Sequence, residues 1–72
     1  SEDCSIVEIT IPDDWVGKSL AELEIRNKYQ VNIIALGRPD GKVEVSVDPN
    51  AMLEKDMTVT MVGLKKNLDK IS

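Results

Sequence analysis

The sequence predicts an α+β domain, in which two helices pack on a four-stranded, mostly antiparallel sheet in the order β-α-β-β-β-α. Three observations predict it: short runs of alternating apolar residues, a helix-capping signature, and an Asp-Gly pair between two apolar runs. The 72 residues suffice for one domain. A core of this size supplies only roughly 3–5 kcal/mol, so we expect self-association to stabilise the fold.

The first strand is expected over residues 5–11, because Val7, Ile9 and Ile11 fall on one face of an extended chain. A proline and two aspartates then stop the strand. The following loop carries Trp15, the only tryptophan. We interpret this side chain as a hydrophobic plug over the edge of the core, with ligand stacking as the alternative.

A helix is predicted to begin at Ser19 or Leu20. Ser19 and Glu22 match a capping box, in which each side chain accepts a hydrogen bond from the backbone amide of the other residue. The apolar positions lose helical spacing after Leu23. The helix should therefore be short, and should end within residues 26–29.

A central, largely buried strand is predicted over residues 31–36, which are apolar and mostly β-branched apart from one asparagine. Asp40-Gly41 then signals a tight hairpin turn. An alternating strand is expected after the turn, over residues 42–47.

The remaining residues predict a loop, a strand and a helix. Residues 51–56 are expected to form a loop or a single turn anchored by Leu53. Residues 57–62 predict the fourth strand, which Gly63 should end. Apolar residues at helical spacing then predict a C-terminal helix over residues 64–71.

Composition excludes several functional classes. The net charge of −4, with both signs interspersed, argues against a nucleic-acid platform. No apolar stretch approaches the ~20 residues that span a bilayer. Histidine is absent, and Cys4 has acidic neighbours that do not activate a thiol. We therefore expect neither an enzyme nor a zinc site. We interpret Asp13-Asp14 as a solvated turn, with weak binding of a cation as the alternative.

The segment LAELEIRNKYQVNII contains a charged cluster followed by a lone polar residue in an apolar run. In a continuous helix, Glu22–Arg26 and Glu24–Lys28 would form surface ion pairs of about 0.3–0.5 kcal/mol each. The alternative is that Arg26 binds an anion. If Asn32 is buried, it needs a polar partner, which could be a backbone group, a subunit interface or a ligand pocket.

The segments VEITIPDDWVGKSLAELEIRNKYQVNIIAL, DGKV, DPN and MTVTMVG together resemble the C-terminal regulatory domain of RCK proteins, regulators of potassium conductance, also called the TrkA-C domain. The resemblance covers about residues 6–68. It implies one regulatory domain over residues 1–72, cut from a longer cytoplasmic gating subunit of the KtrA and TrkA type. The chain opens with SEDCS rather than methionine, which agrees with that interpretation.

The implied partners are a second copy of the domain, a nucleotide-binding RCK N-terminal domain and a membrane potassium transporter subunit. The domain would lie on the inner face of the membrane through that transporter subunit, without inserting into the bilayer. No nucleic acid, cofactor, catalytic residue or metal is implied.

Some members of this family bind cyclic di-AMP between two such domains, and the resemblance extends to a pattern for this ligand. Two copies of Arg26 in a two-fold dimer would face the two phosphates of the symmetric dianion. The residues that match the family's binding pattern are Leu20, Ala21, Glu24, Arg26, Asn32, Ile33, Ile34 and Pro49.

Two alternatives to ligand sensing by a potassium transport subunit stay open. In the first, the domain is a purely structural dimerisation module of the gating ring. In the second, the same regulatory module belongs to a cation/proton antiporter or another transporter.

Overall fold

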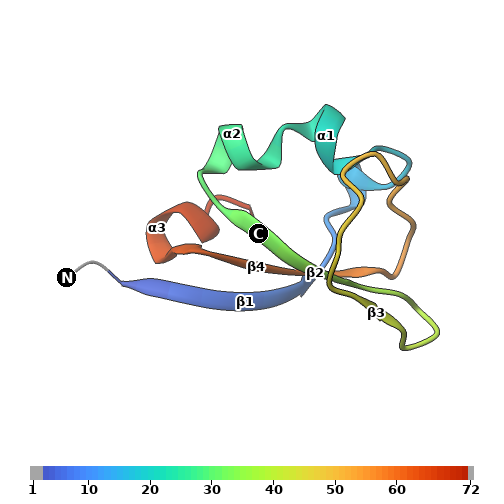
Figure 1. The fold of residues 1–72 in the computed structure, drawn as a ribbon. Helices are drawn as coiled ribbons and strands as arrows, with labels where there is room; N and C mark the ends of the chain where they lie inside the picture. The colour runs from blue at the N-terminus through green and yellow to red at the C-terminus, as the bar shows by residue number, and fades with distance from the viewer. Residues whose placement is uncertain (1–2, 72) are drawn as a thin grey trace.

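The computed structural model describes residues 3–71 and confirms the predicted α+β architecture. One antiparallel sheet has the strand order β1-β4-β2-β3, and the helices lie on one of its faces (Figure 1). The elements, in chain order, are β1 (Cys4–Thr10), the 3-10 helix η1 (Asp13–Trp15), α1 (Leu20–Leu23), α2 (Ile25–Tyr29), β2 (Asn32–Gly37), β3 (Val43–Glu44), β4 (Thr58–Leu64) and α3 (Lys65–Leu68).

The ladder between β1 and β4 is regular over the full length of both strands. It pairs Cys4 with Leu64 at one end and Thr10 with Thr58 at the other, without a register shift. The prediction that Gly63 ends the last strand is wrong, because β4 continues by one further pair opposite the start of β1. Both strands alternate between more and less exposed positions, as the sequence predicts.

The ladder between β2 and β4 is irregular. Its register shifts between Ile33 and Ala35, which places a bulge at Ile34. The expectation that this strand is largely buried is wrong, since Asn32 is exposed and Ile34 is 41% exposed. The reason is that helices cover one face of the sheet, so every second side chain of β2 meets the core.

The hairpin turn forms as predicted, with Gly41 at φ +91°. The Arg38 amide donates to the Lys42 carbonyl at 2.8 Å. The strand after the turn is much shorter than expected, because only Val43–Glu44 pairs with β2.

The chain leaves the sheet after β3 because the loop that follows is bonded to the segment around α1. The Ala21 amide donates to the Pro49 carbonyl, and the Leu53 amide donates to the Lys18 carbonyl, each at 2.8 Å. An isolated antiparallel bridge pairs Ser19 with Met52. The loop therefore crosses to the helical face, where it borders α1.

The Arg38 side chain ties the same loop to β3. Its guanidinium donates to the Glu44 carboxylate at 2.8 Å and to the Glu54 carboxylate at 3.3 Å. The hydrogen bond to Glu44, followed by the charge of Glu44, raises the pKa of Arg38 above its ordinary value. The guanidinium, which is charged in proteins in any case, holds both acidic residues near the end of β2.

The capping box at Ser19 is confirmed, with the Glu22 amide 3.2 Å from the Ser19 hydroxyl and the Ser19 amide 2.9 Å from the Glu22 carboxylate. The helix that it starts is broken by Glu24, which adopts the left-handed conformation with φ 52° and ψ 42°. The expected short helix therefore consists of two pieces, α1 and α2.

Burial explains why the helix breaks at Glu24. In a straight helix, Glu24 would stand one turn from Leu20 on the face that meets the core. The break instead buries Ile25, which is 2% exposed, beside Leu20 at 8%. Fully burying such an apolar side chain contributes about 1.5–3 kcal/mol, which offsets the roughly 1–2 kcal/mol cost of one left-handed residue.

The hydrophobic core lies between the sheet and the helices. Trp15, at 4% exposure, and Leu53, at 1%, are buried as predicted. The last helix, α3, is shorter than the expected span, although Leu68 and Ile71 are buried as its spacing predicts. The buried apolar residues are Ile11, Trp15, Leu20, Ile25, Val31, Leu36, Leu53, Met57, Val59, Met61, Leu68 and Ile71.

Candidate functional site

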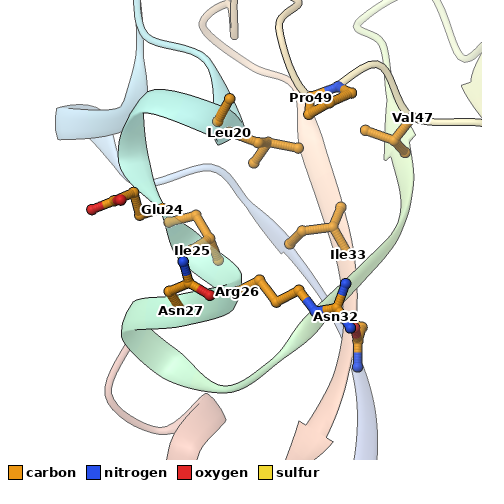
Figure 2. A pocket seen from close by; sticks show the side chains of 10 residues that line it. Leu20, Glu24, Ile25, Arg26, Asn27, Asn32, Ile33, Val47 and Pro49 are labelled. Atoms are coloured by element: carbon orange, nitrogen blue, oxygen red, sulfur yellow. The ribbon is translucent and has the colours of Figure 1, made fainter.

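A pocket of about 410 Å³ lies between the helical segment, the start of β2 and the loop after β3 (Figure 2). Most of its lining residues are solvent-exposed, so the pocket opens directly to water. The lining residues are Leu20, Ala21, Glu24, Ile25, Arg26, Asn27, Asn32, Ile33, Val47 and Pro49.

The structure brings most of the sequence-predicted site residues together around this pocket. They come from α1, from the break at Glu24, from α2, from the start of β2 and from the loop after β3, and they are Leu20, Ala21, Glu24, Arg26, Asn32, Ile33 and Pro49. The remaining predicted residue, Ile34, lies in the bulge of β2 and does not line the pocket.

One wall of the pocket is apolar and held by backbone contacts. Leu20 and Ile33 pack against the core from α1 and β2. Pro49 faces them from the loop (Figure 2). The hydrogen bond from the Ala21 amide to the Pro49 carbonyl fixes the distance between α1 and this loop. The wall presents apolar side chains against which a heteroaromatic ring can pack.

Arg26 places a cation on the other side of the pocket. Its side chain extends from α2 toward Asn32 at the start of β2 (Figure 2). Within residues 3–71, the ion pairs join Arg38 to Glu44 and Glu54, and Lys65 to Asp69. The expected Glu22–Arg26 and Glu24–Lys28 pairs are not among these. The reason is that the break at Glu24 interrupts the continuous helix that those pairs require.

Asn32 is exposed at the mouth of the pocket, so its amide does not need an internal partner. Its side chain lies near the end of the Arg26 side chain (Figure 2). The two residues together offer a charged donor, a neutral donor and an acceptor. This combination suits an anion attached to a group with polar edges, such as a nucleotide.

Three lining residues were not predicted from the sequence: Ile25, Asn27 and Val47. Ile25 reaches the pocket because the break at Glu24 turns α2, which no helical periodicity indicates. Val47 stands two residues before Pro49 and was assigned to a strand, so its place beside the pocket depends on the path of the loop.

Other candidate sites receive no support from the part of the chain that the structure describes. Residues 3–71 contain no group of three or more His, Cys, Asp or Glu side chains arranged to hold a metal ion. Trp15 is buried and does not line the pocket. Among the described helices, none has the length and apolar character that crossing a membrane requires.

A family model described as the TrkA-C domain matches residues 6–72. No curated protein sequence matches the chain. Among solved structures, the RCK C domain of the potassium transport protein KtrA, in complex with cyclic di-AMP, is 34% identical. The match covers 94% of this chain and 79% of that chain, with a TM-score of 0.88.

Two further solved proteins share the fold. The RCK_C domain dimer of S. agalactiae BusR, in complex with cyclic di-AMP, is 27% identical over 90% of this chain and 82% of that chain, with a TM-score of 0.77. A longer BusR chain, bound to promoter DNA, matches over 32% of its length. The GsuK RCK domain is 20% identical, with a TM-score of 0.82, and the match covers 93% of this chain and 15% of that chain. At this identity the similarity shows the fold alone.

Proposed function

The chain belongs to the TrkA-C domain family, and we propose that it is a non-catalytic regulatory domain that binds cyclic di-AMP between two copies of itself. The observation that carries this proposal is the pocket, where Arg26 stands opposite an apolar wall that includes Leu20 and Pro49. A dianion with two heteroaromatic bases needs both features.

Each part of the pocket has a proposed role toward the ligand. Arg26 binds a phosphate through charge-assisted hydrogen bonds. Leu20, Ile33 and Pro49 pack against an adenine, while the Asn32 amide bonds to polar edges of the base or ribose. The 410 Å³ of one pocket is near the lower end of the range for small-molecule sites. Two pockets facing each other would enclose twice that volume, as a dinucleotide requires.

A two-fold dimer gives the proposal its regulatory mechanism. The ligand carries the same symmetry as the dimer, so each phosphate meets one Arg26. If the ligand binds one dimer geometry better than another, it shifts the population of dimers toward the geometry that it binds better. The two copies would pass that shift to whatever domains are attached to them.

The host that we propose is a cytoplasmic gating subunit of a potassium transporter. In it, residues 1–72 act as one regulatory domain, beside a nucleotide-binding RCK N-terminal domain. Support comes from the KtrA domain, which is 34% identical. BusR shows that the same fold also occurs in a protein bound to promoter DNA. The complete coding sequence of the gene would distinguish between three possible hosts: a gating subunit, an antiporter and a DNA-binding regulator.

Isothermal titration calorimetry with cyclic di-AMP tests the ligand. We expect saturable binding by the parent chain and at least about 100-fold weaker binding by Arg26→Ala, because the dimer loses one charged hydrogen bond from each copy, and each contributes about 1.5–3 kcal/mol. Lys28→Ala is the matched control, since it removes one positive charge from the same helix outside the pocket lining. No heat with the parent, or equal affinity for Arg26→Ala, would overturn the assignment.

The alternative function is a structural dimerisation module that binds no ligand. It predicts a melting temperature that rises with protein concentration and does not respond to cyclic di-AMP. The ligand-binding proposal predicts a rise with both, because a ligand that binds only the folded dimer stabilises it by mass action. Differential scanning calorimetry at several protein concentrations distinguishes the two.

A further inference from the structure

Among the described residues that line the pocket, Glu24 is the one that is acidic, and its side chain points away from the pocket's interior. In Figure 2 the Glu24 carboxylate extends to the side opposite Arg26 and Pro49. Within residues 3–71, neither the hydrogen bonds nor the ion pairs formed by side chains involve this carboxylate. The side chain is exposed to water.

The Glu24 backbone, in contrast, determines how the pocket is assembled. Its left-handed conformation, φ 52° and ψ 42°, is where α1 ends and α2 begins. The Glu24 amide donates to the Leu20 and Ala21 carbonyls, and its own carbonyl accepts from the Lys28 amide at 2.8 Å. One residue therefore closes the last turn of α1 and opens the first turn of α2.

The break sets the position of Arg26 relative to the apolar wall. α1 is held against the loop by the hydrogen bond from Ala21 to Pro49, and α2 is held against the core by Ile25. Successive residues of a straight helix are rotated by about 100°. Without the left-handed residue, Ile25 would turn away from the core, and Arg26 would turn with it.

The charge of Glu24 works against binding of an anion. A carboxylate beside a phosphate site repels the ligand, at a strength that depends on the screening by salt. The geometry thus separates two properties of this residue: a backbone conformation that the pocket needs and a negative charge that it does not need.

We propose that Glu24 is a positioning residue, whose left-handed backbone aims Arg26 into the pocket and whose carboxylate does not contact the ligand. This inference depends on the proposed function, since it concerns the same nucleotide site. According to this proposal, position 24 is selected for its backbone conformation and not for its charge. It therefore favours residues that tolerate positive φ, such as glycine, asparagine and aspartate.

Three variants separate charge from conformation, and cyclic di-AMP is the probe in calorimetry. Glu24→Gln removes the charge and keeps the shape, so we expect it to bind about two- to five-fold more tightly than the parent at low salt. The difference in affinity should become smaller at high salt. Glu24→Gly removes the left-handed penalty, so the melting temperature without ligand should rise by about 2–6 °C. Glu24→Val, which is β-branched, should lower it by a similar amount and bind at least about ten-fold more weakly than Glu24→Gly.

The results that would overturn this inference differ from those that would overturn the proposed function. Ten-fold or greater loss of affinity in Glu24→Gln would show that the carboxylate contacts the ligand. Equal affinity of Glu24→Gly and Glu24→Val would show that the break does not position Arg26, and equal melting temperatures would show that it is not strained. Absence of binding by the parent would overturn the assignment of cyclic di-AMP as the ligand, and with it the role of Glu24 in positioning Arg26 for binding. The ligand-free melting temperatures would still decide whether the break is strained.

Discussion

The two halves of the sheet are built differently. On one side, β1 and β4 pair without interruption from Cys4↔Leu64 to Thr10↔Thr58. On the other side, β2 is bulged at Ile34, β3 is two residues long, and the chain leaves the sheet to cover α1. The pocket lies entirely against this second, irregular half.

Irregular backbone geometry and the candidate site coincide in this molecule. Glu24 and Gln30, two non-glycine residues with positive φ, cap the two ends of α2. Departures from regular backbone geometry cost free energy and persist where the surrounding structure enforces them, commonly at functional sites. The regular half supplies the stability that allows the irregular half to keep a pocket open.

The largest expected effect on stability comes from a substitution at the centre of the regular half. Met61 is 1% exposed and pairs with both β1 and β2. Met61→Ala should lower the free energy of unfolding by about 2–5 kcal/mol, which approaches the whole stability of so small a domain. Urea denaturation followed by circular dichroism measures it.

Val43→Ala is the matched control for that variant in the irregular half. Val43 lies on the short β3 and is 64% exposed, so its truncation should change stability by less than about 0.5 kcal/mol. Similar losses for the two variants would contradict the division of the molecule into a supporting half and a pocket half.

The next effect concerns the cap that holds α1 in place beside the pocket. Ser19→Ala removes the acceptor for the Glu22 amide and should lower the midpoint of urea unfolding by the equivalent of about 1 kcal/mol. Ser46→Ala, at an exposed serine in the loop after β3, is the control and should leave the midpoint in place. An unchanged midpoint for Ser19→Ala would mean that tertiary contacts alone hold the helix.

The smallest expected effect comes from a variant that relieves backbone strain in the irregular half. Gln30 has φ 59°, where a glycine avoids the roughly 1–2 kcal/mol cost of a left-handed residue but loses about 0.5–1 kcal/mol through chain entropy. The variant also removes the exposed hydrogen bond from the Gln30 side-chain amide to the Asn27 carbonyl. Gln30→Gly should therefore stabilise the domain by at most about 1 kcal/mol. Lys28→Gly, inside α2, should have the opposite sign; the same sign for both variants would argue against strain at Gln30.

Much of the candidate site could be predicted, because the residues that form it follow one another closely in sequence. Leu20, Arg26 and Asn32 were assigned to one ligand because their order and spacing within a single segment match the family's binding pattern, and the structure places all three around one pocket. Pro49 lies outside that segment and was assigned from the same family pattern. Ile34 was assigned to the same site, but a bulge separates it from Ile33, and no alternation of apolar residues reveals a bulge.

The elements that can be predicted from residues close in sequence are the alternating strand β1, the cap at Ser19 and the turn at Gly41. The strand order, the length of β3 and the break at Glu24 follow from the folded molecule. Each of them depends on burial or hydrogen bonding between segments that are distant in sequence. The break at Glu24 forms because Leu20 and Ile25 are both buried, and β3 ends because the loop that follows it bonds to α1.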